Sequence, residues 1–80
     1  MKATLKIPRL SMNMEEATLR EWRVQPGESF KEGDPLYSIE TEKVTNEVEA
    51  PADGTLLEII IPADTDCVVG DAVCRVEVKD

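Results

Sequence analysis

The stretch "YSIETEKVTNEVEA", residues 37–50, alternates apolar and charged side chains around a single lysine. Successive side chains of a β-strand point to opposite faces, so a hairpin centred between Glu42 and Lys43 sorts them cleanly. A register shifted by one residue would place glutamates in the core. The tip lacks the glycine of the commonest hairpin turns, but a type I turn tolerates these residues. The apolar face would hold Tyr37, Ile39, Thr41, Val44, Asn46, Val48 and Ala50, and the charged face Glu40, Glu42, Lys43, Thr45, Glu47 and Glu49.

Turn residues divide the rest of the chain into short runs rich in Val, Ile, Leu and Thr. This spacing predicts an all-β sandwich or barrel. The segment "SMNMEEATLREW", residues 11–22, is the one helix-like candidate, but its threonine and the nearby Val24 and Pro26 disfavour a helix. The turn signals are Pro8, Pro26-Gly27, Gly33-Asp34-Pro35, Pro51, Asp53-Gly54, Pro62 and Gly70-Asp71.

An internal repeat appears when the chain is shifted by 37 residues. Thr18-Leu19 then meets Thr55-Leu56, and the turn Gly33-Asp34 meets Gly70-Asp71. The apolar spacing between these points also matches. Two such units predict two similar halves related by a pseudo-dyad, with neither half able to bury its apolar face alone. The dyad would place the Lys43 turn at one end of the body and the chain termini at the other.

Composition indicates a single globular domain over residues 1–80, which we expect to be monomeric. Charged residues make up 32 % and hydrophobic residues 41 % of the chain. The net charge of −8 argues against nucleic acid and anionic membranes as partners. No stretch approaches a membrane span, and the start of the chain lacks a signal or transit pattern. We therefore expect a bacterial cytoplasmic protein, or a mitochondrial matrix protein if the domain is excised from a eukaryotic chain.

The cysteines and the tryptophan are expected to be packing residues. The chain has two cysteines and no histidine, so we expect no metal site, and Cys67 and Cys74 are predicted to be free core thiols. Trp22 is predicted to lie in the core, and Gly54 to permit a bend or a close approach. We also expect no catalytic constellation, because no histidine and no serine paired with a base is available.

The stretch "SIETEKVTNEVEAPADGTLLEI", residues 38–59, resembles the lipoyl attachment domain of the dihydrolipoamide acyltransferase component of 2-oxoacid dehydrogenase complexes. The likeness runs nearly end to end. The motif is an acid followed by lysine at a hairpin tip, here Glu42-Lys43, with Gly33 ten residues before the lysine and Gly54 eleven after it. Two departures are Ala17, where glycine is common, and "SMNM" in place of "SPTM", which leave the cognate complex open.

The resemblance implies a barrel-sandwich hybrid, which is a flattened β-barrel of two four-stranded antiparallel sheets with pseudo-two-fold symmetry. It also implies lipoate in amide linkage on Lys43. The expected recognition residues of the attachment turn are Glu42, Val44 and Glu40. The expected partner-contact loop is Met12, Asn13, Met14 and Glu15, although the two methionines equally fit a simple surface cover. From the residues themselves, the carboxylates around Lys43 favour its ammonium form, which suits a tether better than a catalytic base.

The implied function is a swinging arm that shuttles acyl groups and reducing equivalents, with no catalysis by the domain alone. The implied partners are a lipoate ligase or lipoyl transferase, a thiamine-diphosphate-dependent decarboxylase, an acyltransferase core and dihydrolipoamide dehydrogenase. Two alternatives stay open: a biotin carrier, and an unmodified interaction module of the same fold. Biotin domains typically place methionines on both sides of the lysine, and Glu42 and Val44 do not match that pattern.

Overall fold

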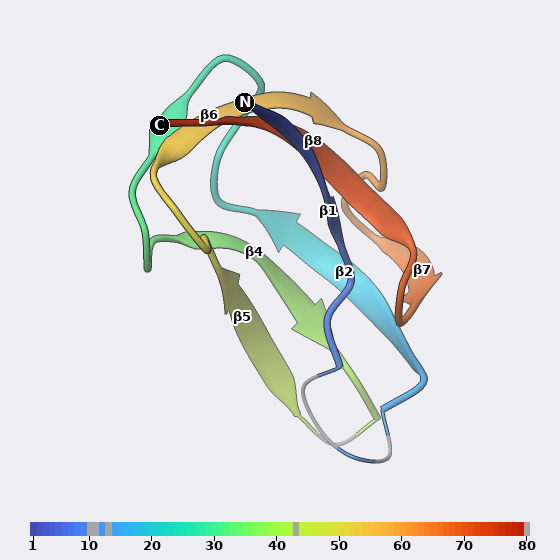
Figure 1. Cartoon of the computed structure of the whole chain (residues 1–80). Helices are drawn as coiled ribbons and strands as arrows, with labels where there is room; N and C mark the ends of the chain where they lie inside the picture. Colours follow the sequence, from blue (N-terminus) through green and yellow to red (C-terminus); the bar gives the residue numbers. More distant parts are fainter. Residues whose placement is uncertain (10–11, 13, 43, 80) are drawn as a thin grey trace.

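The computed structural model describes residues 1–9, 12, 14–42 and 44–79, and within them it shows eight β-strands (Figure 1). No helix in these ranges is long and apolar enough to cross a membrane. Residues 16–22 of the helix-like candidate form a strand, which agrees with the argument against a helix from Thr18, Val24 and Pro26. The strands are β1 (Lys2–Lys6), β2 (Glu16–Trp22), β3 (Ser29–Phe30), β4 (Pro35–Glu40), β5 (Thr45–Glu49), β6 (Gly54–Ile59), β7 (Thr65–Val68) and β8 (Ala72–Val78).

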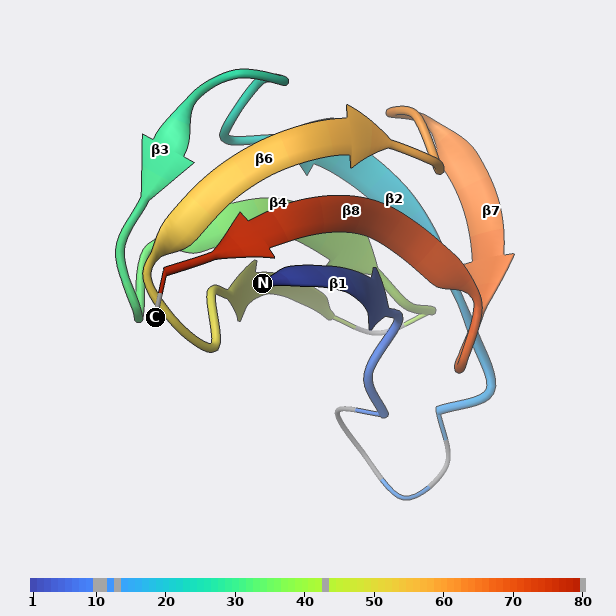
Figure 2. The ribbon, with the colours of Figure 1, turned by 45° about the horizontal axis from the view of Figure 1, so that its top comes forward.

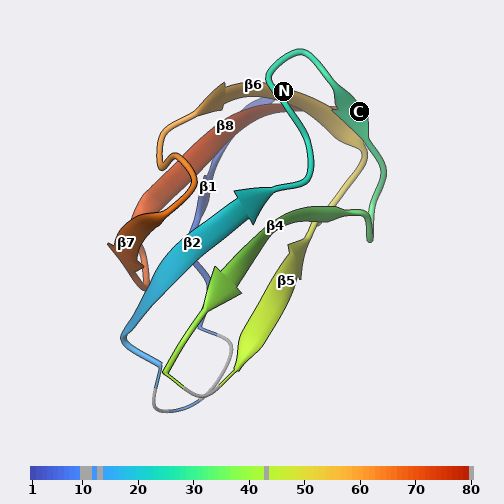
Figure 3. The same ribbon diagram turned by 180° about the vertical axis from the view of Figure 1, so that it is seen from behind.

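The strands form two four-stranded antiparallel sheets, as expected. One sheet has the order β1-β8-β6-β3 and the other β5-β4-β2-β7. The strands of the two halves correspond in order, β1 to β5, β2 to β6, β3 to β7 and β4 to β8. Exchanging each strand for its counterpart converts one sheet order into the other, which confirms the two-fold repeat. Figure 2 shows β6, β8 and β1 curving over the second sheet, and Figure 3 shows that second sheet from its other side.

The Gly-Asp turns are the most exact part of the repeat. The Asp34 carboxylate accepts a hydrogen bond from the Lys31 backbone N–H at 3.0 Å, and the Asp71 carboxylate accepts one from the Val68 N–H at 2.9 Å. Gly33 and its counterpart Gly70 have φ values of 89° and 95°, in the left-handed region that favours glycine. The sequence signal Gly-Asp therefore encodes the same turn twice.

A bulge is repeated as well. The register of β2 against β4 shifts between Leu19 and Glu21, and that of β6 against β8 shifts between Leu56 and Glu58. The extra residues are Arg20 and Leu57, which are 37 positions apart. Each bulge leaves its extra residue exposed, and such bulges re-aim side chains.

The core lies between the sheets and confirms the packing roles predicted for Trp22 and the cysteines. Trp22 packs against Tyr37 with ring centroids 4.9 Å apart, and its indole N–H donates to the Ile61 carbonyl at 2.9 Å. Cys67 and Cys74 are free and buried. The buried apolar residues are Ile7, Met14, Ala17, Leu19, Trp22, Phe30, Leu36, Tyr37, Ile39, Ala50, Leu56, Ile61, Cys67, Val73, Cys74 and Val76.

The two ends of the body differ. The Val78 N–H donates to the Met1 carbonyl at 2.7 Å, so the first and last strands meet at one end. The connection from β4 to β5 lies at the opposite end, together with the described parts of the β1–β2 loop (Figures 1 and 3). The pseudo-dyad predicted this placement of the termini.

Gly54 lies where neighbouring strands of the first sheet approach each other closely. A Cβ atom at this position would overlap the backbone oxygen of Glu77 and lie 3.1 Å from the Phe30 ring. Because a strand backbone cannot yield as a flexible side chain can, we expect Gly54→Ala to lower the free energy of unfolding by about 2 kcal/mol. Urea denaturation measures this change. Thr55→Ala, at the next position of β6, should cost less than about 1 kcal/mol, and equal midpoints for wild type and Gly54→Ala would contradict the expectation.

The buried thiol predicts a loss of stability at alkaline pH. Burial raises the pKa of Cys74 from 9.0 to about 11, because the thiolate is poorly solvated in the core. The unfolded chain therefore releases its proton first, and stability that is complete below pH 9 falls by about 2 kcal/mol as pH rises to 11. Burial raises the pKa values of Tyr37 and Cys67 too, so their ionisation also lowers the stability of the fold as pH rises.

Urea denaturation between pH 8 and 11, with a reductant present, measures this dependence. Cys74→Ala should be less stable at pH 8 because of its cavity, but its stability should fall less steeply above pH 9. Parallel slopes for the two proteins would contradict the assignment to Cys74.

Candidate functional site

The β4–β5 hairpin has the register that the alternation predicts. Next to the tip, Glu40 pairs with Thr45, Ile39 with Asn46, Ser38 with Glu47 and Tyr37 with Val48, so that the residue numbers of each of these four pairs sum to 85. The same rule joins Thr41 to Val44 and leaves a two-residue loop of Glu42 and Lys43. Lys43 itself lies outside the described residues. The register shifts by one residue between Tyr37 and Pro35, where Pro35 pairs with Glu49.

The loop is closed by two hydrogen bonds to one acceptor. The Val44 carbonyl accepts from the Thr41 backbone N–H at 2.8 Å and from the Thr41 hydroxyl at 3.2 Å. Both described neighbours of Lys43 are exposed, and Val44 is 54 % exposed. An enzyme approaching this end of the body therefore meets accessible residues on either side of position 43.

Glu40 is held by an arginine from the adjacent strand. Its Oε1 accepts from Arg20 Nε at 2.9 Å and from Arg20 Nη2 at 2.6 Å, and Arg20 Nη1 lies 3.5 Å from Asp64 Oδ1. The hydrogen bond and charge of Glu40 raise the pKa of Arg20, which keeps the guanidinium charged. Sequence reasoning missed Arg20, because the pair depends on a bulge in β2 whose position the sequence alternation does not specify.

A second ion pair supports the same hairpin. Arg23 Nη2 lies 2.8 Å from Glu47 Oε1, and Arg23 Nη1 lies 3.1 Å from Glu21 Oε1. Because all of these side chains are substantially exposed, the ion pairs add little to the free energy of unfolding. Their main effect is to orient the glutamate side chains of the hairpin. Glu40 and Glu47 are thus paired with arginines. Glu42, which is next to position 43, makes no ion pair within the described part of the chain.

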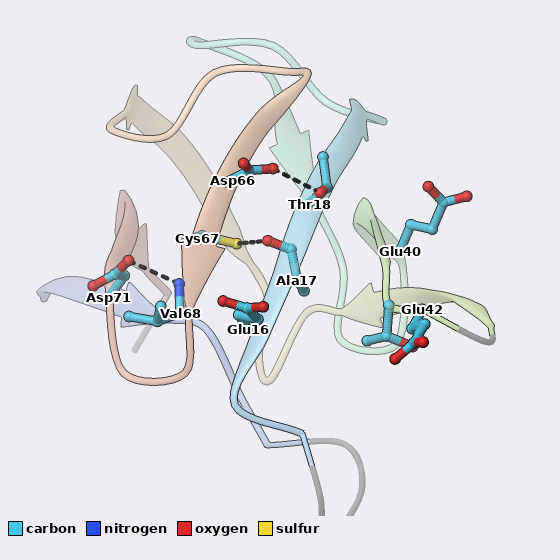
Figure 4. A pocket seen from close by; sticks show the side chains of 10 residues that line it. Glu16, Ala17, Thr18, Glu40, Glu42, Asp66, Cys67, Val68 and Asp71 are labelled. Carbon is cyan, nitrogen blue, oxygen red and sulfur yellow. Dashed lines mark hydrogen bonds between the residues drawn. The ribbon is translucent and has the colours of Figure 1, made fainter.

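An acidic groove of about 430 Å³ opens beside the hairpin, and Figure 4 shows it from close by. Asp66 accepts from the Thr18 hydroxyl at 2.9 Å, and the Cys67 thiol donates to the Ala17 carbonyl at 3.4 Å. The lining residues are Glu16, Ala17, Thr18, Glu40, Thr41, Glu42, Asp66, Cys67, Val68 and Asp71. Five of these ten are acids and none is basic. Sequence reasoning could not predict the groove, because three separate segments of the chain form it.

The predicted partner-contact loop is only partly at the surface. Met12 is 90 % exposed and Glu15 is exposed, but Met14 is 4 % exposed and packs in the core. Placing Met14 in a contact loop is therefore wrong: it lies where the chain turns inward to begin β2, and its side chain joins the apolar cluster. Asn13 lies outside the described residues. The Glu15 carbonyl accepts from the Val69 N–H at 3.0 Å, which ties the end of this loop to the segment after β7.

No three or more His, Cys, Asp or Glu residues among those described are grouped so as to hold a metal ion. Among the described residues, the site consists of the exposed Glu42 and Val44, an arginine-held glutamate and an acidic groove. The carboxylates of the groove give this end of the domain a negative surface, which is complementary to basic groups.

Comparison with known proteins agrees with this geometry. Residues 3–76 match the biotin/lipoyl family model, described as "Biotin-requiring enzyme", whose domains carry covalently attached lipoate or biotin. The chain is 42 % identical over 76 residues, 95 % of its length, to the dihydrolipoyllysine-residue acetyltransferase component of the pyruvate dehydrogenase complex of Rhizobium meliloti (strain 1021). It is 44 % identical over 69 residues, 86 % of its length, to the succinyltransferase component of the 2-oxoglutarate dehydrogenase complex of Cupriavidus necator.

A solved structure matches the whole domain. The solution structure of the lipoyl domain of the 2-oxoglutarate dehydrogenase complex from Azotobacter vinelandii superposes with a TM-score of 0.78 at 28 % identity. The match covers 96 % of this chain and 98 % of that one, whereas the chain spans only 17 % and 16 % of the two acyltransferase components. Since the family model covers nearly all of the sequence, the chain belongs to the biotin/lipoyl attachment family, and the members it resembles are lipoyl domains of acyltransferase components.

Proposed function

We propose that this domain is a lipoyl carrier, with lipoate in amide linkage to Lys43. The observation that carries the proposal is the closed two-residue loop, in which Thr41 and Val44 fix the chain on both sides of Glu42-Lys43. The loop lies at the far end of the body from the termini (Figure 1). A group attached there is remote from the start of β1 and the end of β8.

The described surroundings fit a tethered group better than an enclosed one. Glu42 and Val44 are exposed, and half of the residues that line the neighbouring open groove are acids. Lipoate, when attached, supplies a dithiolane that carries acyl groups and electrons. The protein holds the arm and limits how far it can travel, which raises its effective concentration at each partner site.

The residues next to the lysine divide into two roles. Glu42 and Val44 are exposed on the loop and are the proposed contacts of the lipoate ligase or lipoyl transferase. Glu40 is engaged by Arg20, so we assign it to shaping the end of β4 and not to direct recognition. This assignment places the recognition surface on the loop and leaves the strand as its support.

The partners of the arm are proposed to be those of a 2-oxoacid dehydrogenase complex. They comprise a thiamine-diphosphate-dependent decarboxylase, an acyltransferase core and dihydrolipoamide dehydrogenase. The acidic groove and the net charge of −8 favour approach to basic surfaces, with rates that fall as salt rises. The described parts of the β1–β2 loop lie at the same end of the body as the β4–β5 connection (Figure 3), and the exposed Met12 and Glu15 of this loop complete the proposed contact surface.

We further propose that residues 1–80 act as one attachment domain, monomeric by itself, in the bacterial cytoplasm or the mitochondrial matrix. The continuous core that joins both sheets supports a single folding unit. The acidic charge supports a solution environment in which the domain moves between enzymes.

Coexpression with a lipoate ligase in the presence of lipoate tests the carrier proposal. We expect intact mass to show one lipoyl group and peptide mapping to place it on Lys43. Lys43→Arg should stay unmodified, because the guanidinium cannot form the amide. The matched control is Lys31→Arg, which changes an exposed lysine beside the Gly33-Asp34 turn and should leave modification complete.

Two results would contradict the proposal. A folded wild-type domain that takes up no lipoyl group would favour the unmodified interaction module. A biotin adduct on Lys43, formed when a biotin ligase and biotin are supplied and absent with lipoate, would favour the biotin carrier.

A further inference from the structure

The Thr41 side chain makes a contact that the pairing of the two strands does not require. Pairing already brings the Thr41 N–H within 2.8 Å of the Val44 carbonyl. The hydroxyl adds a second donor to the same oxygen, at 3.2 Å. A carbonyl oxygen has two lone pairs and can accept both. The second bond therefore acts as a latch across the loop, made by the side chain of the residue that begins it.

The latch acts on the part of the hairpin where other restraints are weakest. Along β4, Tyr37 and Ile39 are buried and fix the strand by packing. Beyond Glu40 the chain leaves the core: Thr41 is half-buried, and Glu42 and Val44 are exposed. The Glu-Lys loop also lacks the glycine that pre-sets the commonest two-residue turns.

The chemistry of threonine suits this role. Its branched Cβ restricts rotation about χ1, so the hydroxyl is held toward Val44 at a smaller entropic cost than a longer polar side chain would incur. The neighbouring Arg20–Glu40 pair holds the preceding residue from the side of β2. The base of the loop is thus held by the Arg20–Glu40 ion pair on the side of β2 and by the Thr41 hydroxyl across the hairpin.

We propose that Thr41 is a positioning residue for lipoyl attachment: its hydroxyl keeps the loop in the conformation that the attaching enzyme binds. This inference rests on the proposed function. Binding to a partly populated conformation weakens the apparent affinity in proportion to that population. Loss of the latch should therefore raise KM for the domain and leave kcat for the bound complex nearly unchanged.

The first test compares initial rates of lipoylation of the unmodified domain by a purified lipoate ligase, with lipoate and ATP. Thr41→Val keeps the shape and removes the donor, and we expect KM for the domain to rise by up to about fivefold, the factor given by one ordinary hydrogen bond. Thr41→Ser keeps the hydroxyl and should restore most of the affinity. The matched control is Thr45→Val, because the Thr45 hydroxyl makes no hydrogen bond within the described residues.

A second measurement does not depend on any ligase. Hydrogen exchange of the Thr41 amide should be up to about fivefold faster in Thr41→Val than in wild type, while the amides of Tyr37 and Ile39 should be unchanged. Faster exchange throughout β4 would indicate general loss of stability and would overturn the positioning role, as would unchanged KM and exchange in Thr41→Val. Failure of the wild type to accept lipoate would overturn the carrier proposal and not the latch, which the exchange measurement decides separately.

Discussion

Two matched backbone clasps hold this small body together. In one, the Gly33 N–H donates to the Ala50 carbonyl at 2.9 Å and the Ala50 N–H donates to the Asp34 carbonyl at 2.8 Å. In the other, Gly70 and Asp71 make the same two bonds with Ile7, both at 2.9 Å. The second clasp joins positions more than sixty residues apart and so brings the segment after β1 onto the turn before β8. Closing such a long loop has an entropic cost, which packing of the core helps to offset.

The first clasp also fixes the geometry of the attachment hairpin. It holds the chain just after β5 at Ala50, while the Thr41–Val44 bonds hold the other end, and between them the register shifts once, between Pro35 and Tyr37. From Tyr37 to Glu40 the pairing with β5 is regular. A slip of one residue would turn Val48 outward and bring Glu47 toward the core. The position of the loop therefore follows from a turn that lies at the opposite end of the same hairpin.

Much of this arrangement could be predicted from the sequence, because it depends on period-two patterning. The alternation in residues 37–50 predicts the hairpin register, and the repeated Gly-Asp turn predicts two equivalent halves. Met14 was misplaced because methionine fits both a core and an exposed loop, and only the path of the chain into β2 decides between them. The Arg20–Glu40 pair depends on a bulge, whose position the alternation does not specify.

The pseudo-symmetry also explains why one end of the body differs from the other. The symmetry that relates β4 and β5 to β8 and β1 turns the β4–β5 loop into the place where the Val78 N–H meets the Met1 carbonyl. One half thus has a continuous loop where the other has the two ends of the described chain. The bulge residues diverge in the same way: Arg20 holds a glutamate beside the loop, whereas its counterpart Leu57 is an exposed apolar residue. The shared backbone serves the fold of both halves, and the residues that differ between them adapt one half to carry the loop.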